Sequence, residues 1–215
     1  NRNYSYAWNC SEGEFPGECY QNGSSGIYCD QDYRGISSFS EPCTQIIKNF
    51  VSSKNFKACF NYHSFGNYIF YPFGYTLKNP ISQKEKQIFE SYCVEMTKFN
   101  NYKYGNGADL LYPVNGDATD WMYGEKGIYA FTPEIGNIFD GFWPDKSKIV
   151  NLCKDNLHPN KVLALISGAN YVTNVVNEKG KVIIKIKNNG LLNSGGEIKV
   201  NVLDKTFTIN EIKSQ

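Results

Sequence analysis

Residues 61–75 read NYHSFGNYIFYPFGY, in which His63 stands among seven aromatic residues, two glycines and a proline. The residues from Phe56 to His63 alternate in the manner of a β-strand, with Ala58, Phe60 and Tyr62 on one side. A histidine at the end of a strand lies at the edge of a sheet, where loops expose side chains. His63 is therefore a candidate metal ligand or proton carrier, although a single histidine in such a place is more often structural.

Around this run, apolar periodicity predicts alternating helices and strands. A helix follows the start signal SEP at 40–42, with Ile46, Ile47, Phe50 and Val51 at helical spacing. A second helix over 82–99 places five side chains on one face, namely Ile88, Phe89, Tyr92, Cys93 and Met96. The other predicted elements are a strand at 127–135 and helices at 146–157 and 159–167. Strands that alternate with helices argue for an α/β layered domain.

Beyond Asn170 the sequence changes to the alternation that is typical of β-hairpins. Apolar residues alternate with lysine at 181–187, and the scheme returns at 198–202 and 207–209. About 40 residues of such structure are too few for a secure core of their own. We expect a main domain at 1–172 and a β-hairpin-like appendage at 173–215, which is either an incomplete β-sandwich or a flap on the main domain.

Composition and charge limit the classes of partner. Of the 215 residues, 41% are hydrophobic and 15% aromatic, which suffices for a packed core. The net charge is +1 with no basic stripe, so we expect neither nucleic acid nor a membrane as partner. No apolar stretch is long enough to cross a bilayer. Because the opening NRNYSYAW resembles the middle of a domain, we expect the chain to be a fragment.

The cysteines point to an oxidising compartment. Three of the seven, Cys10, Cys19 and Cys29, lie in a loop rich in Gly, Ser, Glu and Asn, where a disulfide would add about 2–4 kcal/mol. Three glycosylation acceptor patterns occur in the same region, at Asn3, Asn9 and Asn22. We expect a secreted or lysosome-like protein with at least one disulfide among these three cysteines. Cys59, in an apolar alternation, is expected to be a reduced core residue.

Three further residues could carry chemistry, and each also has an ordinary structural explanation. Glu134 in YAFTPEIG is an acid within a β-like apolar run, where burial could favour a general base, or a salt bridge could hold it at a strand end. Tyr112 precedes the turn signal PVNG, and Arg2 offers a planar fork of donors suited to a carboxylate. Alone, these two would be a loop tyrosine and a surface cation.

In combination these residues are much more specific. The chain resembles the C-terminal half of zinc metallocarboxypeptidases of the pancreatic carboxypeptidase A/B and bacterial carboxypeptidase T type. The similar segments are NRN at 1–3, YRGISSFSEP at 33–42, FNYHSFGNYIFYPFGYT at 60–76, LLYPVNGDATDWMYGEKGI at 110–128 and YAFTPEIG at 129–136. They cover roughly the first 170 residues, in the order of the family. The resemblance implies part of an α/β zinc-carboxypeptidase domain, a mixed sheet flanked by helices.

The resemblance also implies a zinc-dependent peptidase that removes single amino acids from peptide C-termini. His63 is similar to the third ligand of one Zn²⁺ ion, and Glu134 is similar to the general base and acid. Zinc lowers the pKa of bound water to about 7, and Glu134 would pass a proton from that water to the leaving amine. Family members take their first two zinc ligands from a preceding His-x-x-Glu motif, which this sequence does not contain.

Substrate-binding roles follow from the same resemblance. Asn1 and Arg2 match the pair that grips the terminal carboxylate, so that only the last peptide bond reaches the metal. Tyr112 matches the mobile tyrosine that closes over that carboxylate, and Ser64 matches a neighbour whose backbone contacts the substrate. The pocket for the last side chain is expected to include Thr119, Asn115 and Asp117.

These roles lead to a set of expectations about activity. Thr119 leaves room for apolar side chains and Asp117 would attract Lys or Arg, so we expect a broad or mixed preference. Partners are peptide or protein C-termini, and the protein is expected to be monomeric. With one of three zinc ligands, residues 1–215 alone are expected to be inactive. The alternatives are an inactive, truncated module that binds peptide C-termini, and a related amidohydrolase that acts on non-protein substrates.

Overall fold

The computed structural model describes residues 2–9 and 23–214 and divides into two compact units, residues 1–160 and 161–215. The division falls within α6 (Leu157–Ile166). The boundary predicted at 172 stays a prediction. Each unit is described by itself, and no helix among the described residues is long and apolar enough to span a membrane.

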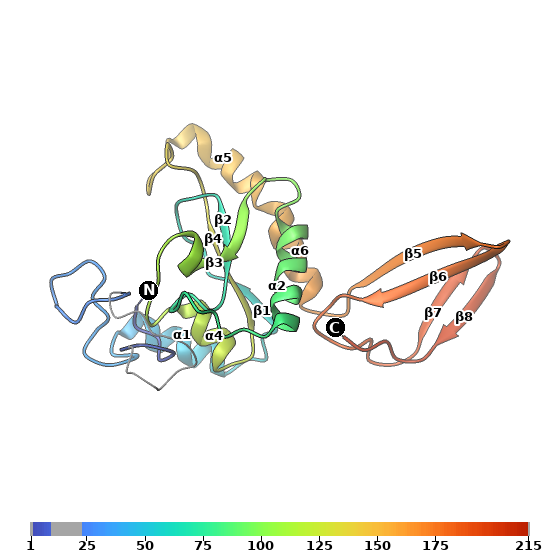
Figure 1. Cartoon of the computed structure of the whole chain (residues 1–215), viewed down its shortest axis with the longest axis horizontal. Coiled ribbons are helices and arrows are strands. Elements are labelled where there is room, and N and C mark those ends of the chain that lie inside the picture. The colour runs from blue at the N-terminus through green and yellow to red at the C-terminus, as the bar shows by residue number, and fades with distance from the viewer. Residues whose placement is uncertain (1, 10–22, 215) are drawn as a thin grey trace. The chain divides into compact units, whose positions relative to one another are not determined.

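The first unit is built on a four-stranded mixed sheet (Figure 1). Its strand order is β1 (Ala58–Phe60), β4 (Tyr129–Glu134), β2 (Tyr68–Tyr71) and β3 (Lys103–Asn106). β1 runs parallel to β4, β4 antiparallel to β2, and β2 parallel to β3. This sheet, together with its helices, confirms the predicted α/β class, although the sequence analysis did not predict β2 and β3.

Helix α2 (Gln83–Met96) packs on the sheet through the face that its sequence predicts, because Ile88, Phe89, Tyr92, Cys93 and Met96 are all buried. The ring of Phe89 stacks on Tyr71 of β2 and meets Phe131 of β4 edge to face. Ser82 caps the helix in a capping box, with the Ser82 hydroxyl accepting from the N–H of Glu85 and the Glu85 carboxylate accepting from the N–H of Ser82.

The remaining helices of this unit are α1 (Pro42–Ser52), α3 (Gly107–Leu110), α4 (Ala118–Gly124) and α5 (Lys146–Asp155). The apolar residues of α1 behave differently from those of α2. Val51 is buried, but Ile46 is 67% and Phe50 is 52% exposed. Periodicity correctly predicted the helix, yet nothing in the described chain covers most of its apolar face.

An aromatic cluster fixes the N-terminal residues beside α4. The rings of Tyr4, Phe39 and Trp121 lie within 5.5 Å of one another, centroid to centroid. The N–H of Tyr4 donates to the carbonyl of Gly116 at 3.0 Å. A side chain on Gly116 would meet the carbonyl oxygen of Arg2 at 2.3 Å, so only glycine permits this approach. The segment that carries Arg2 is thereby held against the loop that follows Tyr112.

The second unit consists of two separate hairpins. β5 (Tyr171–Glu178) pairs with β6 (Lys181–Asn188), and β7 (Ile198–Val202) pairs with β8 (Lys205–Ile209). Of the alternating segments found in the sequence, those at 198–202 and 207–209 form one hairpin, whereas the segment at 181–187 pairs with β5, which was not predicted. Asn188, at the end of β6, links the segments on either side of the first hairpin, because its side-chain oxygen accepts from the N–H groups of Asn170 and Gly190.

Cysteine pairing differs in part from the expectation. The described cysteines, Cys29, Cys43, Cys59, Cys93 and Cys153, are all free thiols. Neither predicted pairing that uses Cys29 is therefore present, which removes part of the argument for secretion. Cys10 and Cys19 lie outside the described residues. Cys59 is partly buried against the core, and burial raises the pKa of its thiol to about 12, as expected for an inert core residue.

Candidate active site

His63 and Glu134 lie side by side at the end of β4. The N–H of His63 donates to the carbonyl of Pro133, and the N–H of Ile135 donates to the carbonyl of His63, both at 2.9 Å. These two bonds flank Glu134 and align the segment after β1 with the end of β4. The Nδ1 atom of His63 is 3.6 Å from Oε1 of Glu134, and their side chains are 33% and 9% exposed.

The position of the His63 ring is further set by Asn61. The side-chain nitrogen of Asn61 lies 3.3 Å from Nε2 of His63, and the N–H of Asn61 bonds the carbonyl of Phe131 at 2.9 Å. Backbone bonds to β4 therefore continue from Asn61 to His63 beyond the end of β1. They hold the imidazole beside the carboxylate of Glu134.

A cavity of about 70 Å³ joins most of the predicted site residues. Six of them line it, namely Arg2, His63, Asp117, Thr119, Tyr112 and Glu134. Tyr112 follows α3 and is 52% exposed. Residues from the N-terminal segment, two strand ends and two loops thus converge on one space, although Arg2 and Glu134 are at opposite ends of the matched sequence.

The floor of the cavity contains polar groups that bond to each other. Asp117 caps α4 by accepting from the N–H of Thr119 at 2.8 Å. The hydroxyl of Thr119 lies 2.6 Å from the hydroxyl of Thr132 on β4, and both threonines are buried. The sequence analysis did not select Thr132, although its position two residues before Glu134 on a strand is the signal that both side chains face the same side.

Asp120 is a second buried carboxylate at the cavity. It is 1% exposed and accepts hydrogen bonds from the N–H groups of Gly74, at 2.9 Å, and Tyr75, at 3.2 Å. Burial raises the pKa of Asp120 well above its usual range, the charge of Asp117 acts in the same direction, and the two N–H donors act against it. Asp120 therefore has a structural role, because it fixes the loop after β2 to α4.

Two predicted substrate-binding residues do not line this cavity, and a third lies outside the described residues. Asn1 lies outside the described residues, and neither Ser64 nor Asn115 is among the described residues that line the cavity. Asn115 is 1% exposed; its N–H donates to the carbonyl of Gly23 at 3.1 Å, and its side-chain oxygen accepts from the hydroxyl of Ser24 at 3.4 Å. These bonds give Asn115 a structural role, and the substrate roles of all three residues stay predictions.

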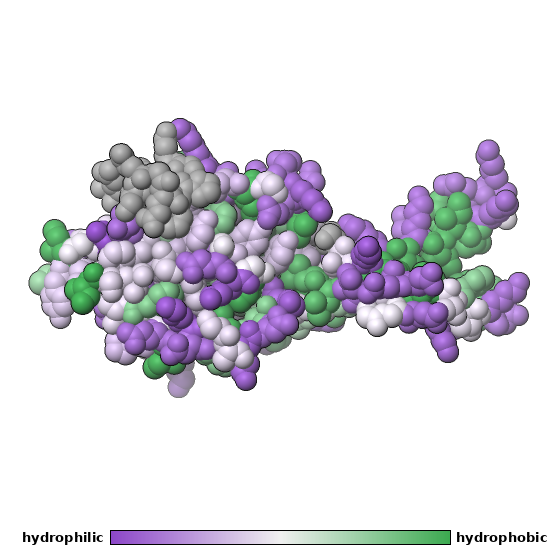
Figure 2. All heavy atoms as spheres, turned by 90° about the horizontal axis from the view of Figure 1, so that it is seen from below, coloured by the Kyte–Doolittle hydropathy of each residue, from purple (hydrophilic) through white to green (hydrophobic). Residues whose placement is uncertain are grey.

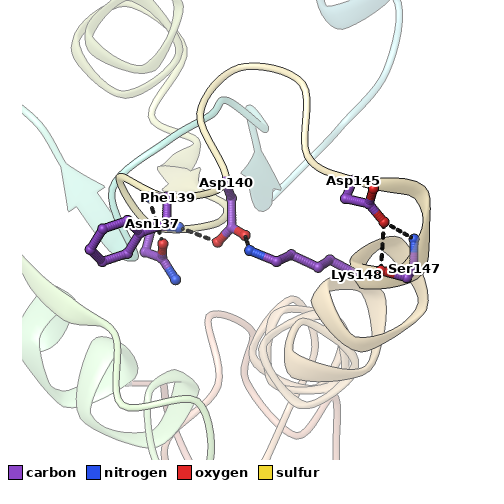
Figure 3. A network of polar contacts seen from close by, with 6 residues as sticks. All are labelled: Asn137, Phe139, Asp140, Asp145, Ser147 and Lys148. Carbon is purple, nitrogen blue, oxygen red and sulfur yellow. Dashed lines mark hydrogen bonds and ion pairs between the residues drawn. The ribbon is translucent and has the colours of Figure 1, made fainter.

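The loop after Glu134 is held by a polar network (Figure 3). The Asp140 carboxylate accepts from the N–H of Asn137 at 2.8 Å and from the Lys148 ammonium of α5 at 2.6 Å. These donors lower the pKa of Asp140. On the same loop, the ring of Phe142 meets that of Phe65, two residues after His63, with centroids 5.0 Å apart. The loop is thus tied to α5 and to the segment that carries His63.

The residues present do not complete a metal site. His63 can offer one imidazole nitrogen to a zinc ion, but the described residues include no group of three or more His, Cys, Asp or Glu side chains that could hold a metal. Glu134 is the adjacent carboxylate, and it cannot both ligate a metal and serve as the base. Among the described residues, His63 is thus a candidate for a single metal ligand, with Glu134 as the neighbouring carboxylate.

The sequence model of the family described as zinc carboxypeptidase matches residues 1–159. The chain belongs to the zinc carboxypeptidase family. Its curated relatives include zinc carboxypeptidase A 1 of Anopheles gambiae, 30% identical over 166 residues, and carboxypeptidase B of Rattus norvegicus, 29% identical over 178 residues. These matches cover 73% and 80% of this chain but only 36% and 39% of the relatives. The chain thus spans less than two fifths of the length of these family members.

Solved structures of the family agree with the fold. Bovine thrombin-activatable fibrinolysis inhibitor, in complex with tick carboxypeptidase inhibitor, is 27% identical with a TM-score of 0.65, over 76% of this chain and 54% of that one. Carboxypeptidase A from Helicoverpa armigera supports the fold alone. It is 23% identical with a TM-score of 0.62, over 76% of this chain and 40% of that one. The predicted family and its α/β fold are therefore confirmed.

Proposed function

We propose that residues 1–172 are the C-terminal portion of the catalytic domain of a metallocarboxypeptidase, which removes single amino acids from peptide C-termini. The observation that carries the proposal is the convergence of Arg2, Tyr112, His63 and Glu134 on one cavity. A guanidinium near a carboxylate base is the arrangement needed to place a C-terminal peptide bond beside that base. Family membership favours this arrangement over a related amidohydrolase that acts on non-protein substrates.

In the proposed reaction, Arg2 binds the terminal carboxylate of the peptide, with Asn1 beside it. Tyr112, half exposed beside the cavity, closes over the same carboxylate. Glu134 accepts a proton from water at its carboxylate and delivers it to the leaving amine. Zinc, when bound, supplies the activated water; His63 would be one of its three protein ligands, and a His-x-x-Glu motif in a preceding segment would supply the other two.

The cavity floor is consistent with a mixed preference for the last side chain of the peptide. The hydroxyls of Thr119 and Thr132 share one hydrogen bond, and both residues, which line the cavity, also carry a methyl group suited to an apolar side chain. Asp117 lines the same cavity and provides the attraction for Lys or Arg. We infer that peptides ending in Phe, Leu, Lys and Arg are all substrates.

Further proposals concern the whole protein. A monomer in a secreted or lysosome-like compartment, with peptide or protein C-termini as its partners, fits the family and the predicted glycosylation patterns. Residues 173–215 are proposed to be a separate β appendage. The alternative is an inactive module that still binds peptide C-termini, which the presence of Arg2, His63, Tyr112 and Glu134 together disfavours.

Metal analysis and release of C-terminal amino acids from peptides, measured on two proteins, test the proposal. Residues 1–215 should bind no stoichiometric zinc and release nothing. A longer chain, which continues upstream through a His-x-x-Glu motif, should bind one zinc ion and release amino acids one at a time from the C-terminus. Tight zinc binding by residues 1–215, or a zinc-loaded longer chain without carboxypeptidase activity, would contradict the proposed function.

A further inference from the structure

Each hairpin of the second unit has one apolar face. Across β5 and β6, Val175 is paired with Ile184 and Thr173 with Ile186, so these side chains share a face with Tyr171 and Val182. Across β7 and β8 the residues on one face are almost all apolar, namely Ile198, Val200, Val202, Phe207 and Ile209. The opposite face of β6 carries Lys181, Lys185 and Lys187.

The two apolar faces border one open cleft. Its volume is about 520 Å³, and its lining includes Tyr171 and Ile186 from the first hairpin and Ile198 and Val200 from the second. Figure 2 shows hydrophobic atoms between the two arms of this unit and hydrophilic atoms on their outer sides. Val175 is 62%, Val182 64% and Phe207 52% exposed. The apolar faces that would form the interior of a β-sandwich are therefore exposed, and an apolar surface of this kind marks a binding site.

The backbone also offers a place for another strand. Among the described residues each of the two sheets contains two strands, so one edge of β6 has no neighbouring strand. An extended peptide that pairs with such an edge alternates its side chains between the two faces of the sheet. One set would enter the apolar cleft, and the other would lie beside the lysines of β6.

Charge indicates what the second set of side chains would be. Residues 161–215 contain eight lysines and four acidic residues, a net charge of +4 that the whole-chain value of +1 conceals. Lys181 is paired with the acidic Glu178, whereas Lys185 is paired with Asn174, which is neutral, so Lys185 has no acidic residue opposite it on β5. A second copy of the same unit would bring like charges together, whereas acidic side chains would complement the lysines.

We propose that the second unit binds an extended protein segment whose residues alternate between apolar and acidic. The segment adds to the free edge of β6, places its apolar side chains in the cleft against β7, and places its acidic side chains beside Lys185. This docking function goes beyond the proposed peptidase activity and does not depend on it.

Fluorescence anisotropy with labelled peptides and the chain 1–215 tests the proposal. A peptide of alternating valine and glutamate should bind saturably, and more weakly as salt is added. A peptide of alternating valine and lysine should bind at least about tenfold more weakly, about 1.4 kcal/mol. Absence of binding would overturn the proposal and would mean that the lysines only protect an exposed strand from aggregation. Equal binding of both peptides would also overturn it.

Matched variants locate the site. Val175→Asn, on the apolar face, should weaken binding of the valine–glutamate peptide at least about fivefold, whereas Val172→Asn, on the opposite face, should change it less than twofold. Both positions are about half exposed or more, so neither change should unfold the hairpin. Lys185→Glu should reverse the preference between the two peptides. Sedimentation that shows a dimer of the chain, lost in Val175→Asn, would make a second copy the occupant and overturn the proposal.

Discussion

Nδ1 of His63 lies 3.6 Å from Oε1 of Glu134, and two backbone hydrogen bonds on either side of Glu134 hold the residues in register. The distance between the two side chains is therefore set by the backbone of the paired segments. No rearrangement of flexible side chains is needed to bring them together. A candidate metal ligand and a candidate base are placed together before any substrate arrives.

In the longer, zinc-loaded protein, Glu134→Gln should reduce turnover by at least about 10²-fold, because glutamine has the shape of glutamate but cannot carry the proton. Zinc content should stay unchanged, since the proposed role of Glu134 is to move protons. Peptide hydrolysis and metal analysis on the same preparation measure both effects. Loss of zinc together with activity would assign Glu134 to the metal and refute its role as base.

Asp117→Ser should shift specificity with little effect on the fold. Serine is also a good N-cap, so α4 keeps its first hydrogen bond while the negative charge at the cavity is removed. For the longer protein, kcat/KM should fall at least about tenfold for peptides ending in Lys or Arg, about 1.4 kcal/mol. Peptides ending in Phe or Leu serve as the internal control and should change little. A uniform loss for all four would show that Asp117 does not select the side chain.

Asn3→Ala should destabilise the first unit and misplace Arg2. The buried amide of Asn3 donates to the carbonyls of Arg34 and Ser37, and its oxygen accepts from the hydroxyl of Thr44 at 2.6 Å. Removing a buried group with several partners leaves those partners unsatisfied, at about 1–3 kcal/mol for each buried group. Denaturant unfolding should show a loss of at least about 2 kcal/mol. The exposed Asn55→Ala is the control, and similar values for both variants would contradict the expectation.

Glu85→Gln should destabilise the protein in a manner that depends on pH. Hydrogen bonds from the Ser82 and Tyr123 hydroxyls lower the pKa of Glu85 below its unfolded value. The stabilisation is therefore fully present above the unfolded pKa and is lost as the pH falls through the folded pKa. Unfolding of both proteins between pH 7 and pH 3 should show a difference of up to about 1 kcal/mol at neutral pH that vanishes in acid.

The control for this experiment is Glu95→Gln, near the opposite end of α2. A carboxylate there does not benefit from the helix dipole, and its ion pairs with Lys98 and His158 are exposed. The control should have a small effect at every pH. A difference for Glu85→Gln that persists unchanged at pH 3 would show that the capping geometry, and not the charge, stabilises the helix.

Local pattern was sufficient for several elements of the fold. The buried face of α2 and the run that forms β4 were both predicted, because periodicity reports directly which side of a helix or strand is apolar. β2 was missed because it lies in an aromatic run broken by Gly and Pro, which does not alternate clearly enough to indicate a strand. β3 was missed because its four residues, KYGN, contain a single apolar side chain. The pairing of β6 with β5 was missed because alternation does not specify which strand is the neighbour.

The sequence by itself determined the family and the identity of the candidate site residues, because both depend on residue types at fixed spacing. Only the tertiary structure decided which of them share a cavity. It placed Arg2 beside Tyr112 through the contacts of Tyr4 and Gly116, joined Thr132 to Thr119, and gave Asn115 a structural role. The physical reason is that these contacts join segments that lie far apart in the chain. The periodicity of one segment shows which of its faces is apolar, but it does not show which other segment covers that face.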